Sequence, residues 1–128
     1  MSAFRSWNGV ESFSLYPGVS MHAIGGDQVL VCRVSYEPGT TVRRHKHEAT
    51  EQVMLILDGS VRMTVGDETK DLVAGDVVVV NRGIEHELSS EHGFSFIEAL
   101  APPPLDHVPD RERDLVLGDL AGSLHVDA

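Results

Sequence analysis

Cysteine and basic residues are scarce in this sequence of 128 residues, and each scarcity narrows what the protein can be. The single cysteine, Cys32, excludes an internal disulfide, and its apolar neighbours favour a buried thiol over a reactive one. Ten lysines and arginines stand against twenty acidic residues, which gives a formal net charge of −10. Long-range repulsion therefore disfavours nucleic acid or an anionic membrane as a partner and leaves a small molecule open.

Long apolar runs and a leader segment are also missing. No apolar run approaches the ~18 residues of a membrane-spanning helix, and no charged-then-apolar leader precedes a cleavage site. Hydrophobic residues make up 41% and charged residues 23% of the chain, as in an ordinary globular domain. We therefore expect one soluble, cytoplasmic domain.

Short apolar or alternating runs follow one another along most of the chain, separated by turns that contain Gly, Pro or Asp. Their spacing of roughly 8–12 residues indicates a sandwich or barrel rather than β-α-β units. The predicted fold class is therefore all-β. Strands are expected at residues 19–24, 28–36, 51–57, 60–65, 77–80, 84–89 and 94–100.

Two local patterns and one change of composition give further predictions. Asp58-Gly59 is the strongest hairpin signal, because both residues tolerate the positive φ that a two-residue turn requires. The four valines at 77–80 do not alternate with polar residues, which predicts a strand covered on both faces. Residues 102–128 begin with three prolines and are rich in acids. We expect them to form a C-terminal extension that packs on the barrel or on a second subunit.

The segment around His45 and His47 contains the candidate metal ligands. Residues i and i+2 of a strand point the same way, so both imidazoles would project to one side, as two ligands of one metal must. A third ligand can come from Glu51 or Gln52, and hydrophobic alternation does not decide between them. A further candidate is His86, on another predicted strand. The alternative interpretation is that the first two histidines are exposed residues of an edge strand beside three basic neighbours.

With these residues the sequence resembles the cupin family in two linked motifs. In the first family motif, G-x5-H-x-H-x3–4-E/Q-x6-G, the six-residue gap to the last glycine selects Gln52 over Glu51. In the second, G-x5-P-x-G-x2-H-x3-N, the proline and the asparagine are replaced here by Asn81 and Ser90. The matching positions are Gly39, His45, His47, Gln52 and Gly59 in the first motif, and Gly75, Gly83 and His86 in the second.

The resemblance covers about residues 18–101 and implies a double-stranded β-helix, a jelly-roll barrel, that is often dimeric. Residues 1–17 are then an N-terminal arm and residues 102–128 the extension. It also implies one divalent transition metal inside the barrel, held by His45, His47, Gln52 and His86. A homodimer that binds a small molecule, with no nucleic acid or membrane partner, is the expected assembly.

The implied ligand set favours Lewis-acid chemistry. Three neutral imidazoles and a neutral amide leave the ion its full charge, so it polarises a carbonyl or enol oxygen more strongly than a carboxylate-ligated ion would. Such a site suits zinc, nickel or iron, and the residues do not identify which. Glu98 shares a strand face with Phe94 and Phe96 and is the candidate catalytic general base, with a raised pKa, if that face looks inward. If the face looks outward, Glu98 is simply solvated.

The three-His-plus-Gln set is similar to that of cupins that linearise or isomerise unsaturated uronates and of cupins that cyclise aromatic polyketides. The uronate enzymes place an arginine six residues after the acid, where this chain has Pro104. The expected inner wall is apolar and suits a flat, polyketide-like molecule better. Its residues are Met54, Ile56, Leu88, Phe94 and Phe96.

The first functional hypothesis is thus a metal-dependent cyclase or isomerase that acts on an oxygenated, partly apolar small molecule. The alternatives are a metal-dependent dioxygenase that uses iron, nickel or copper, and a non-catalytic cupin that binds a small molecule. Among the other histidines, His92, His107 and His125 are interpreted as incidental. His22, on an early strand, is a weak candidate for the barrel mouth.

Overall fold

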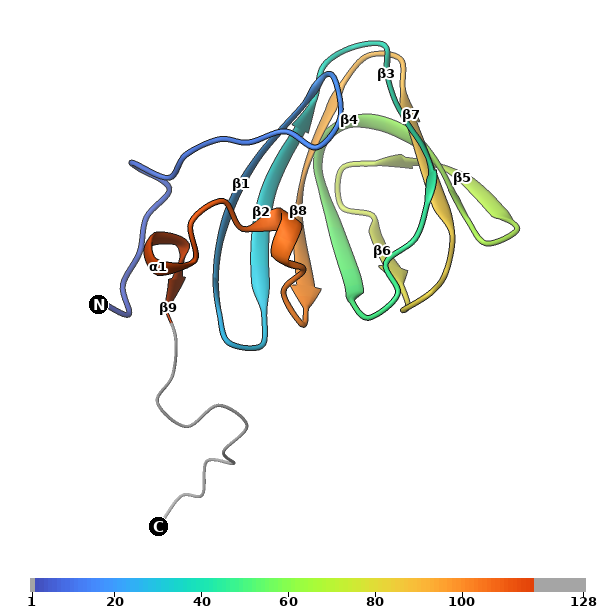
Figure 1. Ribbon diagram of the computed structural model, residues 1–128. Helices are drawn as coiled ribbons and strands as arrows, with labels where there is room; N and C mark the ends of the chain where they lie inside the picture. The colour runs from blue at the N-terminus through green and yellow to red at the C-terminus, as the bar shows by residue number, and fades with distance from the viewer. Residues whose placement is uncertain (1, 117–128) are drawn as a thin grey trace.

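The computed structural model describes residues 2–116, which form the curled β-barrel shown in Figure 1. The all-β jelly-roll prediction is confirmed. Residues 117–128 of the predicted extension, with His125, lie outside the described residues. The strands are β1 Val19–Gly26, β2 Leu30–Tyr36, β3 Thr40–His45, β4 Glu51–Val65, β5 Glu68–Val73, β6 Val77–Val80, β7 His86–Ser90, β8 Phe94–Ala101 and β9 Leu115–Val116; the helical turns are η1 Leu105–His107 and α1 Arg111–Asp114.

The strands form two sheets that share the long strand β4. Neighbours along the main path run in the order β3-β7-β4-β8-β2-β1-β9, and β5 and β6 also pair with β4. Strict alternation builds the inner faces: every second residue of β8 is buried, and β2 alternates in the same way. The buried side chains of both sheets meet in one apolar core, which includes the predicted buried thiol of Cys32. Within residues 2–116 no helix is long and apolar enough to cross a membrane.

The hairpin predicted at Asp58-Gly59 is wrong, because β4 continues through both residues. The register of β4 against β8 shifts between Ile56 and Asp58, and Gly59 has a φ of 75°. A Cβ at position 59 would lie 2.3 Å from the Gly93 carbonyl oxygen, so only glycine fits there. The positive φ that the sequence signals thus serves a β-bulge, at which β4 passes from one sheet to the other.

The prediction that the four valines of β6 are covered on both faces is also wrong. Val77 and Val79 are 59% and 54% exposed, so one face of β6 is open to solvent in the described structure. Register places further apolar residues beside Val79 on the outside of the sheet. We call this set the outer apolar row: Val79, Val53, Ala99 and Val31, one each from β6, β4, β8 and β2.

Both ends of the described chain lie against the barrel. The N-terminal arm joins it through paired backbone hydrogen bonds of 2.9 Å between Phe13 and Met21. At the other end β9 pairs in parallel with β1, next to α1 (Figure 1). An ion pair of 3.0 Å between Glu11 and Arg113 links the two terminal segments directly.

Candidate metal centre

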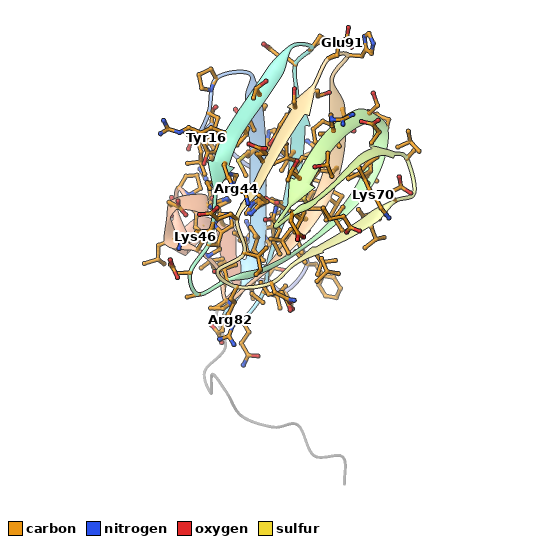
Figure 2. The ribbon with its side chains drawn as sticks, turned by 90° about the vertical axis from the view of Figure 1, so that its right-hand side faces the viewer. Tyr16, Arg44, Lys46, Lys70, Arg82 and Glu91 are labelled. Carbon is orange, nitrogen blue, oxygen red and sulfur yellow. The ribbon has the colours of Figure 1, made fainter. Side chains whose placement is uncertain are left out.

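Three histidines converge because of how β3 ends and β7 begins. Side chains alternate along residues 44–47: Arg44 and Lys46 are exposed, labelled in Figure 2, and pair with Glu85 at 2.7 Å and Glu48 at 3.1 Å. His45 and His47 take the intervening positions and line the barrel cavity. The exposed ion pairs contribute little stability. Alternation of side chains along the strand puts the two imidazoles on the inner side.

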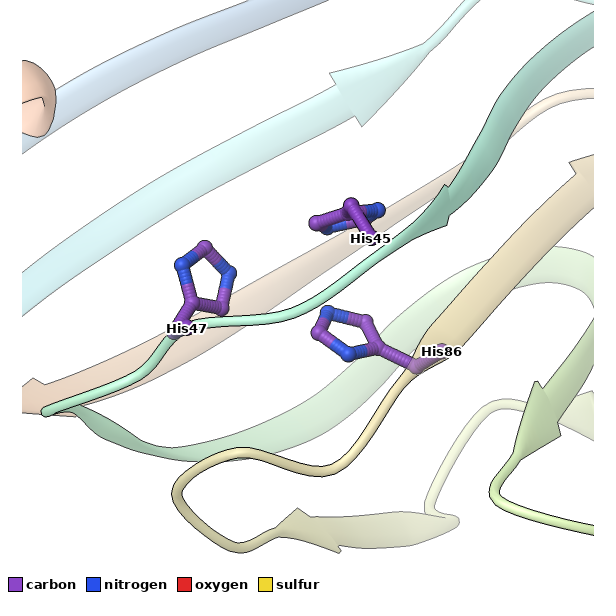
Figure 3. A group of neighbouring side chains, drawn as sticks. All are labelled: His45, His47 and His86. Atoms are coloured by element: carbon purple, nitrogen blue, oxygen red, sulfur yellow. The ribbon is translucent and has the colours of Figure 1, made fainter.

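His86 completes the group from the neighbouring strand. It is the first residue of β7 and pairs in register with His45, the last residue of β3. The ring centroids of these two lie 4.1 Å apart, and those of His47 and His86 lie 5.3 Å apart. One nitrogen from each of the three rings falls within 4.8 Å of the others (Figure 3). This spacing suits three nitrogens that bind one ion.

Backbone carbonyls fix the ring tautomers of two of these histidines. His45 Nδ1 lies 2.8 Å from the Arg43 carbonyl oxygen, and His86 Nδ1 lies 3.1 Å from the Ile84 carbonyl oxygen. A carbonyl only accepts, so each Nδ1 donates its hydrogen and each neutral ring keeps its lone pair on Nε2. This second-sphere contact is the usual one for a metal-binding histidine.

Burial favours the neutral form of two of the imidazoles, those of His47 and His86. Burial, together with the smaller effect of the neighbouring imidazoles of His86, His107 and His45, lowers the pKa of His47 to about 4. Burial likewise lowers the pKa of His86, and the Ile84 carbonyl opposes this in part. Neutral imidazole is the form that binds a metal ion, so His47 and His86 can bind one near neutral pH.

Gln52 and Glu98 lie beside the histidines on the inner face of β4 and β8. Gln52 pairs opposite Leu100 and Glu98 opposite Met54, so the two polar residues are diagonal neighbours. The Gln52 Nε2 donates a hydrogen bond to the Glu98 carboxylate. Glu98 is only 3% exposed, and burial raises its pKa to about 7 against the effect of that hydrogen bond. The inward orientation expected for Glu98 is therefore the one observed.

The donor set fits a metal ion. Among the described residues, the buried side-chain N and O atoms without a hydrogen-bond partner are Gln52 Oε1 and His86 Nε2. Leaving two such acceptors unpaired in the interior is costly, and a cation removes the cost. Glu51, the other candidate from the sequence, is exposed and does not line the cavity. The geometry thus favours Gln52, and the assignment of the four ligands stays a prediction.

A cavity of about 60 Å³ opens beside this group. Its wall contains three of the five apolar residues expected there, Met54, Leu88 and Phe96, whereas Ile56 and Phe94 are buried in the core and do not line the cavity. No lysine or arginine of residues 2–116 lines it. Its charged or ionisable lining residues are His45, His47, His86, Glu98, Tyr16, Tyr36, Asp106 and His107.

Sequence reasoning missed His107, which it set aside as incidental. The η1 turn buries this ring against the cavity, with its centroid 5.8 Å from that of His47. A signal was present in the chain, where an Asp-His pair stands between Pro104 and Pro109 directly after the last barrel strand. The other weak candidates do not line the cavity: His22 faces out of β1 and His92 is exposed.

The chain is similar to a curated protein, to solved structures and to a family model. It is 37% identical over 57 residues to the HTH-type transcriptional regulator PuuR of Escherichia coli (strain K12), and the match covers 44% of this chain and 30% of that protein. The chain thus spans less than a third of the length of this curated relative.

Solved structures with the same fold are similar to the chain over most of its length. The structure of KdgF from Halomonas sp. has a TM-score of 0.74 at 18% identity, covering 81% of this chain and 98% of that one. The polyketide cyclase RemF from Streptomyces resistomycificus has a TM-score of 0.67 at 20% identity, covering 80% of this chain and 83% of that one. The family model described as "Cupin domain" matches residues 32–96, which is half of the chain. The chain therefore belongs to the cupin family.

Proposed function

We propose that this protein is a metal-dependent enzyme whose single divalent transition ion is held by His45, His47, His86 and Gln52. The observation that carries the proposal is the pair of buried, unpartnered acceptors, Gln52 Oε1 and His86 Nε2, beside two more imidazoles. A bound ion of the zinc, nickel or iron type supplies a Lewis acid that polarises a carbonyl or enol oxygen. The residues of the chain bind the substrate, exclude water and move the proton.

The proposed reaction is the cyclisation or isomerisation of an oxygenated, partly apolar small molecule of the polyketide kind. The apolar wall of Met54, Leu88 and Phe96 supports a partly apolar substrate, and no lysine or arginine of the described residues lines the cavity to pair with a substrate carboxylate away from the ion. The likeness to RemF, a polyketide cyclase, supports the same class. The cavity of about 60 Å³ is larger than one water requires.

Glu98 is the proposed acid/base residue. Its carboxyl group lines the cavity, is shielded from water, and touches the Gln52 side chain. In an isomerisation or cyclisation a proton leaves one carbon or oxygen of the substrate and returns at another, and a carboxylate in this position can carry it. The same carboxylate also holds the Gln52 amide so that its oxygen, rather than its nitrogen, is left free.

We also propose that a second copy of the chain covers the outer apolar row. Val79 and its neighbours form an uncharged band across four strands, and the paired residues Val77, Leu55 and Ile97 extend it. Each chain has a net charge of −10, so the acidic surfaces of two copies repel each other. Contact through an uncharged band keeps those surfaces apart. The proposed assembly is a homodimer that binds a small molecule and neither nucleic acid nor membrane.

Metal analysis of protein purified without a histidine tag or added metal tests the proposed function. Close to one equivalent of zinc or nickel per chain, with no oxygen uptake, supports Lewis-acid chemistry. Bound iron together with oxygen consumption would instead favour the dioxygenase. If the purified protein contains no divalent metal and also binds none that is added, a non-catalytic binding module is favoured.

A further inference from the structure

Two residues of the C-terminal segment complete the wall of the cavity, although neither belongs to a barrel strand. The η1 turn places Asp106 and His107 there, with the His107 backbone N–H donating to the Pro104 carbonyl at 3.1 Å. The His107 side chain is buried, whereas that of Asp106 is 69% exposed. A buried imidazole thus borders the cavity with a carboxylate bound to one of its nitrogens.

The carboxylate of Asp106 fixes the tautomer of His107. Its Oδ1 lies 2.8 Å from His107 Nδ1, and an ionised carboxylate only accepts hydrogen bonds. In the neutral ring Nδ1 therefore carries the hydrogen and Nε2 keeps a lone pair. The hydrogen bond that the described side chains make with this ring is at Nδ1, which leaves Nε2 as an acceptor for a molecule in the cavity.

His107 lies next to the proposed metal ligands without joining them. Its ring centroid is 5.8 Å from that of His47, in an edge-on arrangement. The nitrogens that fall within 4.8 Å of one another come from His45, His47 and His86, and the ring of His107 contributes none of them. A molecule that approached the ion would therefore meet a fixed imidazole acceptor beside it.

Contacts from both ends of the chain hold this residue in place. The ring of Phe13 packs edge-on against His107, with centroids 6.4 Å apart. The Phe13 backbone is hydrogen-bonded to Met21 of β1. Further along, Arg113 bonds the buried Asp114 carboxylate through two contacts of 2.6 Å and Glu11 of the arm at 3.0 Å. The position of His107 is thus determined by the packing of two terminal segments and not by an exposed loop.

We propose that His107 is a substrate-binding residue whose Nε2 accepts a hydrogen bond from a substrate hydroxyl, and that Asp106 positions it. The inference rests on the proposed metal site and adds a substrate class: neutral molecules that carry a hydroxyl group next to the metal-bound carbonyl. An acceptor beside a Lewis acid selects such a molecule over its ether, because the ether has no hydrogen to donate and leaves the acceptor unpaired.

The experiment uses the full-length, zinc-loaded protein with two small probes, hydroxyacetone and methoxyacetone. Both carry the carbonyl, and only the first carries the hydroxyl. Dissociation constants are measured by ligand-observed NMR, and zinc content is measured on the same samples. The variants are His107→Leu, His107→Gln, which keeps an oxygen acceptor, and Asp106→Asn, which can donate to Nδ1 and so reverse the tautomer. The exposed His92→Leu is the matched control.

The wild-type protein and His92→Leu are expected to prefer hydroxyacetone about tenfold, the upper range for one hydrogen bond. His107→Leu loses that preference with unchanged zinc content, His107→Gln recovers part of it, and Asp106→Asn reduces it. A wild-type protein that binds zinc but treats both probes alike overturns this inference and leaves the proposed function standing. Loss of zinc from His107→Leu also overturns it, since the residue would then be a ligand. A wild-type protein that binds no zinc overturns the proposed function itself.

Discussion

Replacing Gln52 by Glu tests the contact at the centre of the site. The substitution keeps the shape of the side chain and exchanges the amide group that donates to Glu98 for a second carboxylate oxygen. Because both residues are buried, two carboxylates would then touch in the interior. Without a metal ion they cannot both be ionised at low cost, so they share a proton.

The size of the effect follows from this contact. A hydrogen bond to a charged group is worth roughly 1.5–3 kcal/mol, and repulsion between the two carboxylates adds to its loss. We expect metal-free Gln52→Glu to lose about 2–4 kcal/mol of unfolding free energy near pH 8. At about 4 °C per kcal/mol for a domain of this size, the melting temperature falls by roughly 8–16 °C.

The loss depends on pH with a definite sign. Burial already raises the pKa of Glu98 to about 7, and a second carboxylate raises the pKa of the pair further. A carboxyl whose pKa is raised on folding favours the folded state at low pH and costs stability as the pH rises through its folded value. The difference between Gln52→Glu and wild type should therefore be small near pH 5 and full near pH 8.

Metal ions should reverse the defect, because a divalent cation neutralises both carboxylates. Affinity for zinc rises in Gln52→Glu, whereas a carbonyl-polarising reaction slows, since the added charge weakens the ion as a Lewis acid. Thermal unfolding with a chelator and with zinc, at pH 5 and pH 8, measures the effect. Glu51→Gln, at the exposed neighbouring position, is the control and should change nothing. If metal-free Gln52→Glu is as stable as wild type at pH 8, the contact with Glu98 is wrong, and if its zinc affinity does not rise, the assignment of Gln52 as a ligand is wrong.

Four further results are expected. His86→Ala loses most bound metal, and its stability falls through the lost binding linkage and the loss of a buried side chain; near-stoichiometric metal in this variant would show a misassigned ligand. Glu98→Gln keeps its metal and slows turnover by about 10²-fold or more, and an unchanged rate would retire Glu98 from catalysis. In the metal-free wild type the pKa of His47 is about 4, below the 6.5 of an unfolded histidine. The neutral imidazole therefore stabilises the folded state above pH 6.5, and this stability is lost as the pH falls towards 4. The unfolding free energy measured as a function of pH checks this result. Val79→Lys gives a monomer in light scattering at an unchanged fold, and a variant that stays dimeric would contradict the proposed interface.

The local patterns of the chain predicted most of the barrel. Alternation gave the strands around Cys32 and Glu98, because burial of every second residue follows directly from strand geometry, but it left open whether Glu98 faces inward or outward. The spacing of His45 and His47 likewise predicted two imidazoles on one side. Only the cupin resemblance favoured Gln52 over Glu51, since apolar residues follow each of them at every second position of the sequence.

The remaining features depend on contacts between distant parts of the chain. A glycine with positive φ suits a turn and a bulge equally, so the path of β4 through Gly59 is decided by the approach of Gly93. The exposure of Val79 depends on where β6 falls in the sheet, which composition does not reveal. His107 reaches the cavity through a short turn beyond the barrel, without any periodic pattern that would point to it.

X-ray absorption spectroscopy of the tag-free protein loaded with one equivalent of zinc tests the central claim most directly. The account predicts a first shell of nitrogen and oxygen at about 2.0–2.1 Å with the outer-shell scattering of three imidazoles, and in His86→Ala the little zinc that stays bound shows fewer than three. A spectrum without imidazole scattering, or one that His86→Ala leaves unchanged, would contradict it.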